Sequence, residues 1–94
     1  MEPIYGLVAI GLVDPRHVKR NADARAGDTI ILAKALGVGV YGAALKKQQL
    51  TGLQYQELIA STTRLNTPGM WLAGLPGVHA LTDVTGFGLL GHLM

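Results

Sequence analysis

The feature that most constrains the fold is a run of apolar residues close to the N-terminus. Residues 4–13 read Ile-Tyr-Gly-Leu-Val-Ala-Ile-Gly-Leu-Val, with Pro3 before them and Asp14-Pro15 after them. The run is short and has no polar face, so it predicts a strand that is buried on both sides. Left without neighbours, such a strand is a template for pairing with another chain. We therefore expect residues 4–13 to lie in a sheet and to mediate a homodimer where that sheet is incomplete.

The composition bounds the class of protein. The chain has 94 residues, of which 49% are hydrophobic and 15% charged, so it has little polar surface to cover a core. This imbalance indicates an excerpt whose apolar faces pack on other segments. The net charge is +2 and the only basic cluster lies in a connecting segment, so we expect no nucleic-acid partner. No apolar run reaches about 18 residues, so no membrane span is expected. The absence of cysteine suits a cytoplasmic protein.

The spacing of apolar residues and breakers predicts an α+β chain. Two further apolar runs predict strands, and the box Thr51-Gly52-Leu53-Gln54 predicts that a helix starts near residue 52. Short turns are expected after Asp14-Pro15 and at residues 26–28. The predicted order is β-β-α-α-β-α. Strands are predicted over 4–13, 29–33 and 78–84, helices over 40–49, from about 52 and over 86–94, and a short helical turn over 70–75.

The end of the chain combines an acidic residue, hydroxyls and glycines. Asp83 closes a predicted strand, and Gly86 and Gly88 follow where a helix begins. A buried carboxylate is costly unless it binds a cation or donors, and glycines let backbone approach a phosphate. Thr85 is the better-placed helix cap, which leaves Asp83 free to bind Mg²⁺, a cation that prefers oxygen ligands and brings substrate phosphates with it. On the residues alone, metal binding and helix capping are equal alternatives for Asp83.

A glycine pattern raises a second possibility. Gly-x-Gly-x-x-Gly occurs twice, each time after a predicted strand, which is the context of a dinucleotide-binding fingerprint. Glu57 lies about 20 residues after the first glycine, where an acidic residue would bind ribose. However, Glu57 falls within a predicted helix, and no acidic residue follows the second copy. Dinucleotide binding and glycines that serve packing alone both stay open. The two sets are Gly37, Gly39, Gly42 and Gly86, Gly88, Gly91.

Three other polar residues have more than one interpretation. Lys34, at the end of a predicted strand, could contact a phosphate or carry a surface charge, and the residues favour the surface. His79 and His92 stand among apolar neighbours, which favours partly buried supporting roles over metal ligation.

The run Thr-Asp-Val-Thr-Gly-Phe-Gly-Leu-Leu-Gly-His-Leu, residues 82–93, resembles a signature of the selenophosphate synthetases (selenide, water dikinases). The similarity continues over essentially the whole chain. It departs at Ala33 and Ala35, on either side of Lys34, where the family usually has Thr and Pro. The supporting segments are Glu-Pro-Ile-Tyr-Gly-Leu from residue 2, Lys-Arg-Asn-Ala from 19, Ala-Gly-Asp from 26, Leu-Ala-Lys-Ala-Leu-Gly-Val-Gly from 32, and Leu-Asn from 65.

This resemblance implies a fold and an activity. The fold is that of the aminoimidazole ribonucleotide synthetase superfamily, whose N-terminal domain dimerises. Residues 1–20 would be the last strand and exit of an N-terminal ATP-binding domain, and residues 21–94 the first part of an α+β C-terminal domain. The implied enzyme converts selenide, ATP and water to selenophosphate, AMP and phosphate, with Mg²⁺ bridging ATP phosphates and aspartates.

The resemblance also assigns site residues. Asp83 matches one of the family's metal aspartates, and Thr85, Gly86 and Gly88 are expected beside the bound ATP. The family's catalytic Cys or selenocysteine, with its lysine, matches no residue of this chain. We therefore expect no catalytic residue here and no activity from the chain alone. A non-selenium enzyme of the superfamily, resembling thiamine-monophosphate kinase or a hydrogenase-maturation protein, and a purely structural module are the alternatives.

Overall fold

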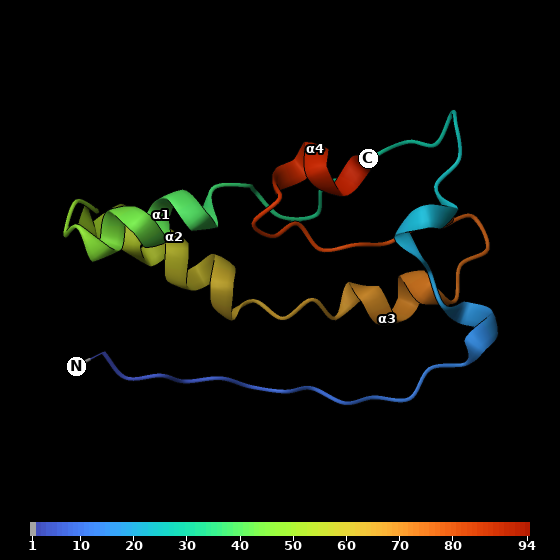
Figure 1. Cartoon of the computed structure of the whole chain (residues 1–94), viewed down its shortest axis with the longest axis horizontal. Coiled ribbons are helices and arrows are strands. Elements are labelled where there is room, and N and C mark those ends of the chain that lie inside the picture. Colours follow the sequence, from blue (N-terminus) through green and yellow to red (C-terminus); the bar gives the residue numbers. More distant parts are fainter. Residues whose placement is uncertain (1) are drawn as a thin grey trace.

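Helices supply the regular secondary structure of the computed structural model, which describes residues 2–94. Two 3-10 turns come first, followed by four α-helices joined by extended connections (Figure 1). Met1, the first residue of the predicted 1–20 unit, lies outside the described residues. In chain order the elements are η1 (Pro15–His17), η2 (Asn21–Asp23), α1 (Val38–Lys46), α2 (Gly52–Thr63), α3 (Pro68–Ala73) and α4 (Gly88–Leu93).

The start of α2 confirms the capping box that the sequence predicts. The Gln54 backbone N–H donates to the Thr51 hydroxyl at 3.2 Å, and the Thr51 N–H donates to the Gln54 side-chain oxygen at 3.0 Å. Each bond satisfies a backbone donor that has no partner within the helix. The predicted turn after Asp14 is confirmed as well, because its carboxylate accepts the Arg16 N–H at 2.9 Å and caps η1.

The last helix begins later than predicted. It starts at Gly88, its N-cap position is Phe87, and no side chain caps it. The prediction that Thr85 caps this helix is therefore wrong. Instead, the Thr85 carbonyl accepts the Gly88 N–H at 3.0 Å and closes a turn before the helix. Gly88 adopts φ +71°, a left-handed conformation that glycine tolerates best, so the turn at residues 85–88 delays the helix.

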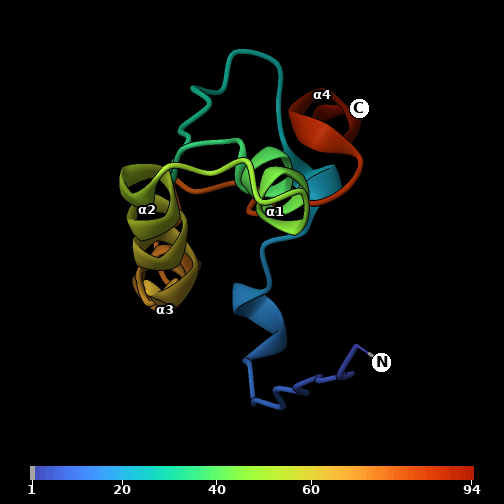
Figure 2. The same ribbon diagram turned by 90° about the vertical axis from the view of Figure 1, so that its left-hand side faces the viewer.

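The three predicted strands are not observed, so the β-β-α-α-β-α order is not confirmed. Residues 4–13, 29–33 and 78–84 are not assigned to strands within the described part of the chain. The first of these segments, residues 4–13, runs apart from the helices (Figure 1). The view turned by 90° shows the same separation (Figure 2). A strand exists only through hydrogen bonds to a neighbouring strand, and residues 2–94 place no such neighbour beside these segments. Apolar patterning alone therefore did not produce a sheet.

The core is correspondingly small. Helices α1 and α2 pack against each other, and Leu58 of α2, 7% exposed, is the one buried hydrophobic side chain among residues 2–94. The radius of gyration is 16.2 Å, against roughly 12 Å for a compact domain of this length. The accessible surface is 8686 Å², against roughly 5,200 Å² for a globular protein of this mass. Most apolar side chains are therefore uncovered in this structure.

Three long-range contacts tie the segment around η2 to the C-terminal half. The Lys19 ammonium donates to the Leu75 carbonyl at 2.9 Å, just beyond α3. The Asn21 amide donates to the carbonyl of His92 in α4 at 2.8 Å. Farther along, Asp28 contacts His79, as discussed below. These polar contacts, rather than apolar packing, hold the connecting segment against α3 and α4.

Candidate functional site

Asp83 lies in the extended segment that leads toward α4, and it is exposed. Figure 1 shows this segment running past α3 before the chain turns back into α4. Among residues 2–94 the hydrogen bonding at Asp83 involves its backbone carbonyl, which accepts from the Thr82 hydroxyl at 3.1 Å. The carboxylate thus caps neither α4 nor a neighbouring turn. Its oxygens are left accessible to a ligand.

The glycines after Asp83 have different physical roles. A Cβ placed on Gly86 would meet no atom within 4 Å, so its backbone is open to approach. Gly88 has the left-handed φ described above. A Cβ on Gly91 would lie 2.8 Å from the Phe87 Cβ, a distance that real Cβ atoms do not reach. Gly91 therefore serves packing, whereas Gly86 leaves room for a ligand.

The Asp83 carboxylate fits a magnesium ion as one ligand among several. Mg²⁺ takes hard oxygen ligands, commonly one or two carboxylates together with substrate phosphates and water. Asp83 offers accessible carboxylate oxygens, and no cluster of three or more acidic, histidine or cysteine side chains exists within residues 2–94. The described chain thus supplies a single carboxylate at this position, and the remaining ligands would have to come from substrate, water or other carboxylates.

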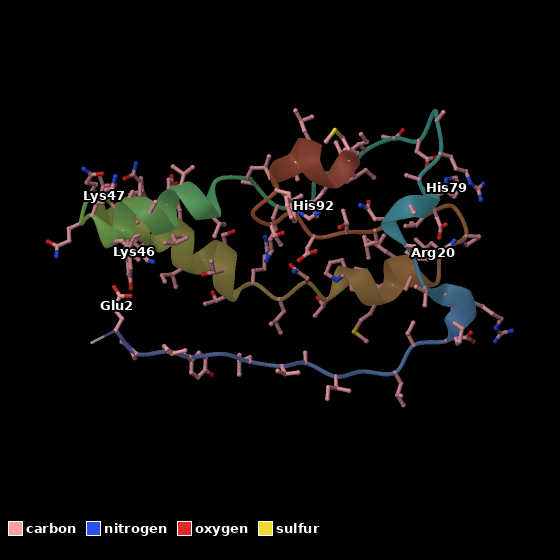
Figure 3. The ribbon with its side chains drawn as sticks, viewed as in Figure 1. Glu2, Arg20, Lys46, Lys47, His79 and His92 are labelled. Atoms are coloured by element: carbon pink, nitrogen blue, oxygen red, sulfur yellow. The ribbon has the colours of Figure 1, made fainter. Side chains whose placement is uncertain are left out.

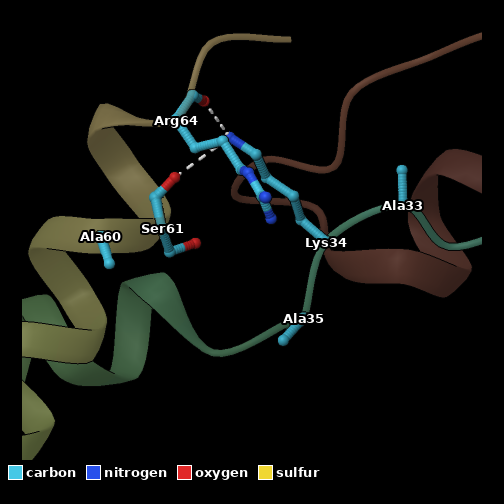
Figure 4. Close-up of a pocket in the computed structure, with 6 residues that line it drawn as sticks. All are labelled: Ala33, Lys34, Ala35, Ala60, Ser61 and Arg64. Carbon is cyan, nitrogen blue, oxygen red and sulfur yellow. Dashed lines mark hydrogen bonds between the residues drawn. The ribbon is translucent and has the colours of Figure 1, made fainter. Parts of the chain in front are cut away.

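Lys34 is engaged with a helix end rather than free at the surface. Its ammonium donates to the Ser61 carbonyl at 3.0 Å and to the Arg64 carbonyl, at the point where α2 ends (Figure 4). Carbonyls in the last turn of a helix have no partner within it, and a cation there also favours the negative end of the helix dipole. The interpretation that favours a surface charge is incomplete, because Lys34 is half-buried and its ammonium is bonded to the end of α2. Lys34 also lines an open hollow of about 560 Å³. The lining residues are Ala33, Lys34, Ala35, Ala60, Ser61 and Arg64.

The dinucleotide-binding alternative loses its structural context. The fingerprint requires a strand before the glycines, and residues 29–33 form no strand in the described chain. Glu57, the candidate ribose ligand, lies on α2 and accepts a hydrogen bond from the Tyr41 hydroxyl at 3.1 Å. That bond to an anionic acceptor raises the pKa of Tyr41. Gly37 adopts φ +112° at the N-cap of α1, so this glycine serves the entry of the helix.

Two histidines that were not among the predicted site residues make polar contacts in this region. Both are half-buried, which confirms the expectation of partial burial. The His79 Nδ1 atom lies 2.8 Å from the Asp28 carboxylate, and His92 Nε2 lies 3.1 Å from both the backbone nitrogen and the hydroxyl of Thr85. Figure 3 shows the labelled His92 side chain on the side of α4 that faces the incoming segment. Sequence spacing gave no signal for either pairing, because both depend on how the chain turns back.

A match to a known domain family shows which family the chain belongs to. The family described as "AIR synthase related protein, C-terminal domain" matches residues 25–94. The chain belongs to this family. Its membership supports the superfamily that the sequence motifs predict, although the strand order stated for it is not observed.

Curated relatives of this AIR synthase related domain are named selenide, water dikinase. The chain is 65% identical to that of Dechloromonas aromatica and 67% identical to that of Burkholderia ambifaria, each over 94 residues. It is 59% identical to that of Rhizobium meliloti over 92 residues. The match covers all of this chain but only 27% of the first two relatives, so the chain spans about a quarter of their length. No solved structure matches the chain. Within the described residues, no helix has the length and apolarity needed to cross a membrane.

Proposed function

We propose that this chain is the part of an ATP-dependent selenophosphate synthetase that joins its two domains. The observation that carries the proposal is the similarity of the whole chain to proteins named selenide, water dikinase, at 59–67% identity. The proposed reaction converts selenide, ATP and water to selenophosphate, AMP and phosphate. ATP and selenide are then the substrates of the complete enzyme.

Within that enzyme, Asp83 is the proposed ligand of Mg²⁺, and Thr85, Gly86 and Gly88 the proposed contacts to ATP. Phosphoryl transfer needs charge neutralisation and positioning more than covalent help from the protein, and bound Mg²⁺ supplies that charge. Asp83 supports this role because its carboxylate is exposed and unused by capping. Gly86 supports it because a Cβ built on this residue would meet no atom within 4 Å.

The proposal includes a domain division and a homodimer. Residues 1–20 would complete an N-terminal ATP-binding domain, and residues 21–94 would begin the C-terminal domain. The family match, which starts at residue 25, supports this division. The exposed apolar side chains of residues 4–13, including Ile4 at 101% and Leu12 at 104% exposure, support burial of that segment in a larger assembly.

A segment exchange tests the function. These 94 residues replace the matching segment of the Dechloromonas aromatica protein, and selenide-dependent formation of AMP from ATP is measured. The chimera should be active, and Asp83→Asn should abolish turnover without altering the helical circular-dichroism signal. An inactive chimera, although folded, would contradict the proposed function. The 94-residue chain alone should show no turnover above a protein-free control, since it lacks the family's nucleophile and one weak ligand does not hold Mg²⁺ against its hydration.

The matched control is Glu57→Gln, the same carboxylate-to-amide change on α2. Glu57 contacts Tyr41 and has no role in the proposed site, so this variant should retain the activity of the chimera. Activity kept in Asp83→Asn would contradict the proposed role of Asp83. Phosphorylation of another acceptor without selenide would favour a non-selenium enzyme of the superfamily.

A further inference from the structure

The Thr85 residue of the candidate site is bonded at each of its polar groups. Its backbone N–H donates to His92 Nε2 at 3.1 Å, and its hydroxyl oxygen lies 3.1 Å from the same nitrogen. Its carbonyl accepts the Gly88 N–H at 3.0 Å. His92 is thus hydrogen-bonded to the turn that follows Asp83.

The positions of the protons in these hydrogen bonds can be assigned from chemistry. A backbone N–H can only donate, so Nε2 of His92 must be the acceptor in that bond. The ring is then neutral and carries its proton on Nδ1. With Nε2 as the acceptor, the Thr85 hydroxyl at 3.1 Å can only donate to it, so the N–H and the hydroxyl of Thr85 share one acceptor. The Thr85 hydroxyl proton is therefore engaged with His92 in this structure.

The imidazole is also fixed by packing. The Phe87 ring meets it edge-on, with centroids 6.0 Å apart and an interplanar angle of 70°. Phe87 can occupy this place because Gly91 has no side chain, since a Cβ there would lie 2.8 Å from the Phe87 Cβ. The Asn21 amide donates to the backbone carbonyl of His92 at 2.8 Å and so holds the main chain of this residue. The imidazole is therefore held by Thr85 and Phe87, and the backbone of His92 by Asn21.

We infer that His92 is a positioning residue, which holds Thr85 and so sets the backbone from which Asp83 projects, two residues earlier. The inference rests on the proposed function for its consequence: a misplaced turn moves the proposed magnesium ligand and the turn residues that are proposed to contact ATP. Side chains that orient a metal ligand without touching the metal commonly change its metal affinity by about 10–100-fold when they are replaced.

Two variants separate the hydrogen bond from the packing. His92→Gln places an amide oxygen near the position of Nε2 and keeps an acceptor for the Thr85 N–H. His92→Phe keeps an aromatic ring against Phe87 but removes the acceptor. In the chimeric enzyme, His92→Phe should raise the Mg²⁺ concentration for half-maximal rate by about 10-fold or more, while His92→Gln should stay within about 3-fold of the parent. Equal Mg²⁺ dependence in all three proteins would overturn the inference, as would a larger loss in His92→Gln than in His92→Phe.

A second measurement does not depend on activity. Nitrogen-15 NMR of the complete 94-residue chain reports which imidazole nitrogen carries the proton, and hydrogen exchange reports protection of the Thr85 amide. We expect the Nδ1–H form and a protected amide in the parent, with protection kept in His92→Gln and lost in His92→Phe. The Nε2–H form, a mixture of forms, or an exchange rate unaffected by His92→Phe would contradict the inference. An inactive parent chimera would count against the proposed function and leave this outcome standing.

Discussion

His79 and Asp28 lie 51 positions apart in sequence, yet the His79 Nδ1 atom is 2.8 Å from an Asp28 carboxylate oxygen. The other oxygen of Asp28 accepts the Arg25 N–H at 2.8 Å. Gly27 precedes it with φ +95°, so the turn that presents Asp28 depends on glycine. The pair thus fastens the connecting segment to the segment that carries Asp83.

Acid should weaken this contact. The Arg25 N–H, and next the His79 side chain, lower the pKa of Asp28 below its ordinary 3.8. A carboxyl group with a lowered pKa stabilises the folded state above its ordinary pKa, and that contribution is lost as the pH falls through the lowered value. The free energy of unfolding is measured in urea at about pH 5 and about pH 3. Asp28→Asn should lower it at pH 5 and reduce the difference between the two pH values.

A second aspartate gives a comparison for this experiment. Arg16 holds the pKa of Asp14 down at about 2, so Asp14 stays ionised over most of the same range. In the unfolded chain Asp14 binds its proton near the ordinary pKa of 3.8, inside this range, so Asp14→Asn should also flatten the loss of stability between pH 5 and pH 3. An unchanged slope in Asp28→Asn would show that the His79 contact does not form in solution.

Leu58 should matter more to the helical pair than any other leucine of α2. It is 7% exposed, whereas Leu53 on the same helix is 68% exposed. Leu58→Ala should lower the free energy of unfolding by about 2 kcal/mol, the lower end of the range for a buried leucine. Leu53→Ala should change it by less than about 0.5 kcal/mol. Far-UV circular dichroism during urea unfolding gives both values, and equal losses would mean that α1 does not cover Leu58.

Lys34 should stabilise the end of α2 and not the binding of ATP. Lys34→Met removes the donor to the Ser61 and Arg64 carbonyls and should cost about 1 kcal/mol in unfolding free energy. Lys46→Met, which changes an exposed lysine in the last turn of α1, should cost less. The comparison is made by thermal unfolding of the chain and by the ATP concentration for half-maximal rate in the chimera. A rise in that concentration without a loss of stability would indicate phosphate contact instead.

The isolated chain should associate through residues 4–13. Val8 and Ile10 are 89% and 94% exposed, and burying a large apolar side chain stabilises association by roughly 1.5–3 kcal/mol. Sedimentation at micromolar concentration should show a dimer or larger species, which Val8→Lys and Ile10→Lys shift toward monomer. Leu53→Lys, a charge on an exposed α2 position, should have no such effect. A monomeric parent would be evidence that this segment does not mediate assembly.

The sequence could point to a candidate site because the chemistry is carried by residue types, and the role of these residues stays a prediction. Asp83 and the glycines after it were identifiable as a possible metal and phosphate corner, and the structure leaves that carboxylate exposed. Thr85 was assigned the wrong local role because a cap and a turn residue share the same preferences. Its actual partner, His92, is seven residues away and meets it only after the chain reverses.

The sequence by itself determined the features that are closed by hydrogen bonds over two or three residues. The Thr51–Gln54 box and the Asp14 cap of η1 belong to this class, and both formed where predicted. Only the tertiary structure decided how Lys34, Asp28 and His92 are used, because their partners lie far along the chain or across a reversal of it. Tertiary structure also decided the state of residues 4–13. An apolar pattern says that a segment needs covering, but a strand forms only where another strand accepts its backbone hydrogen bonds.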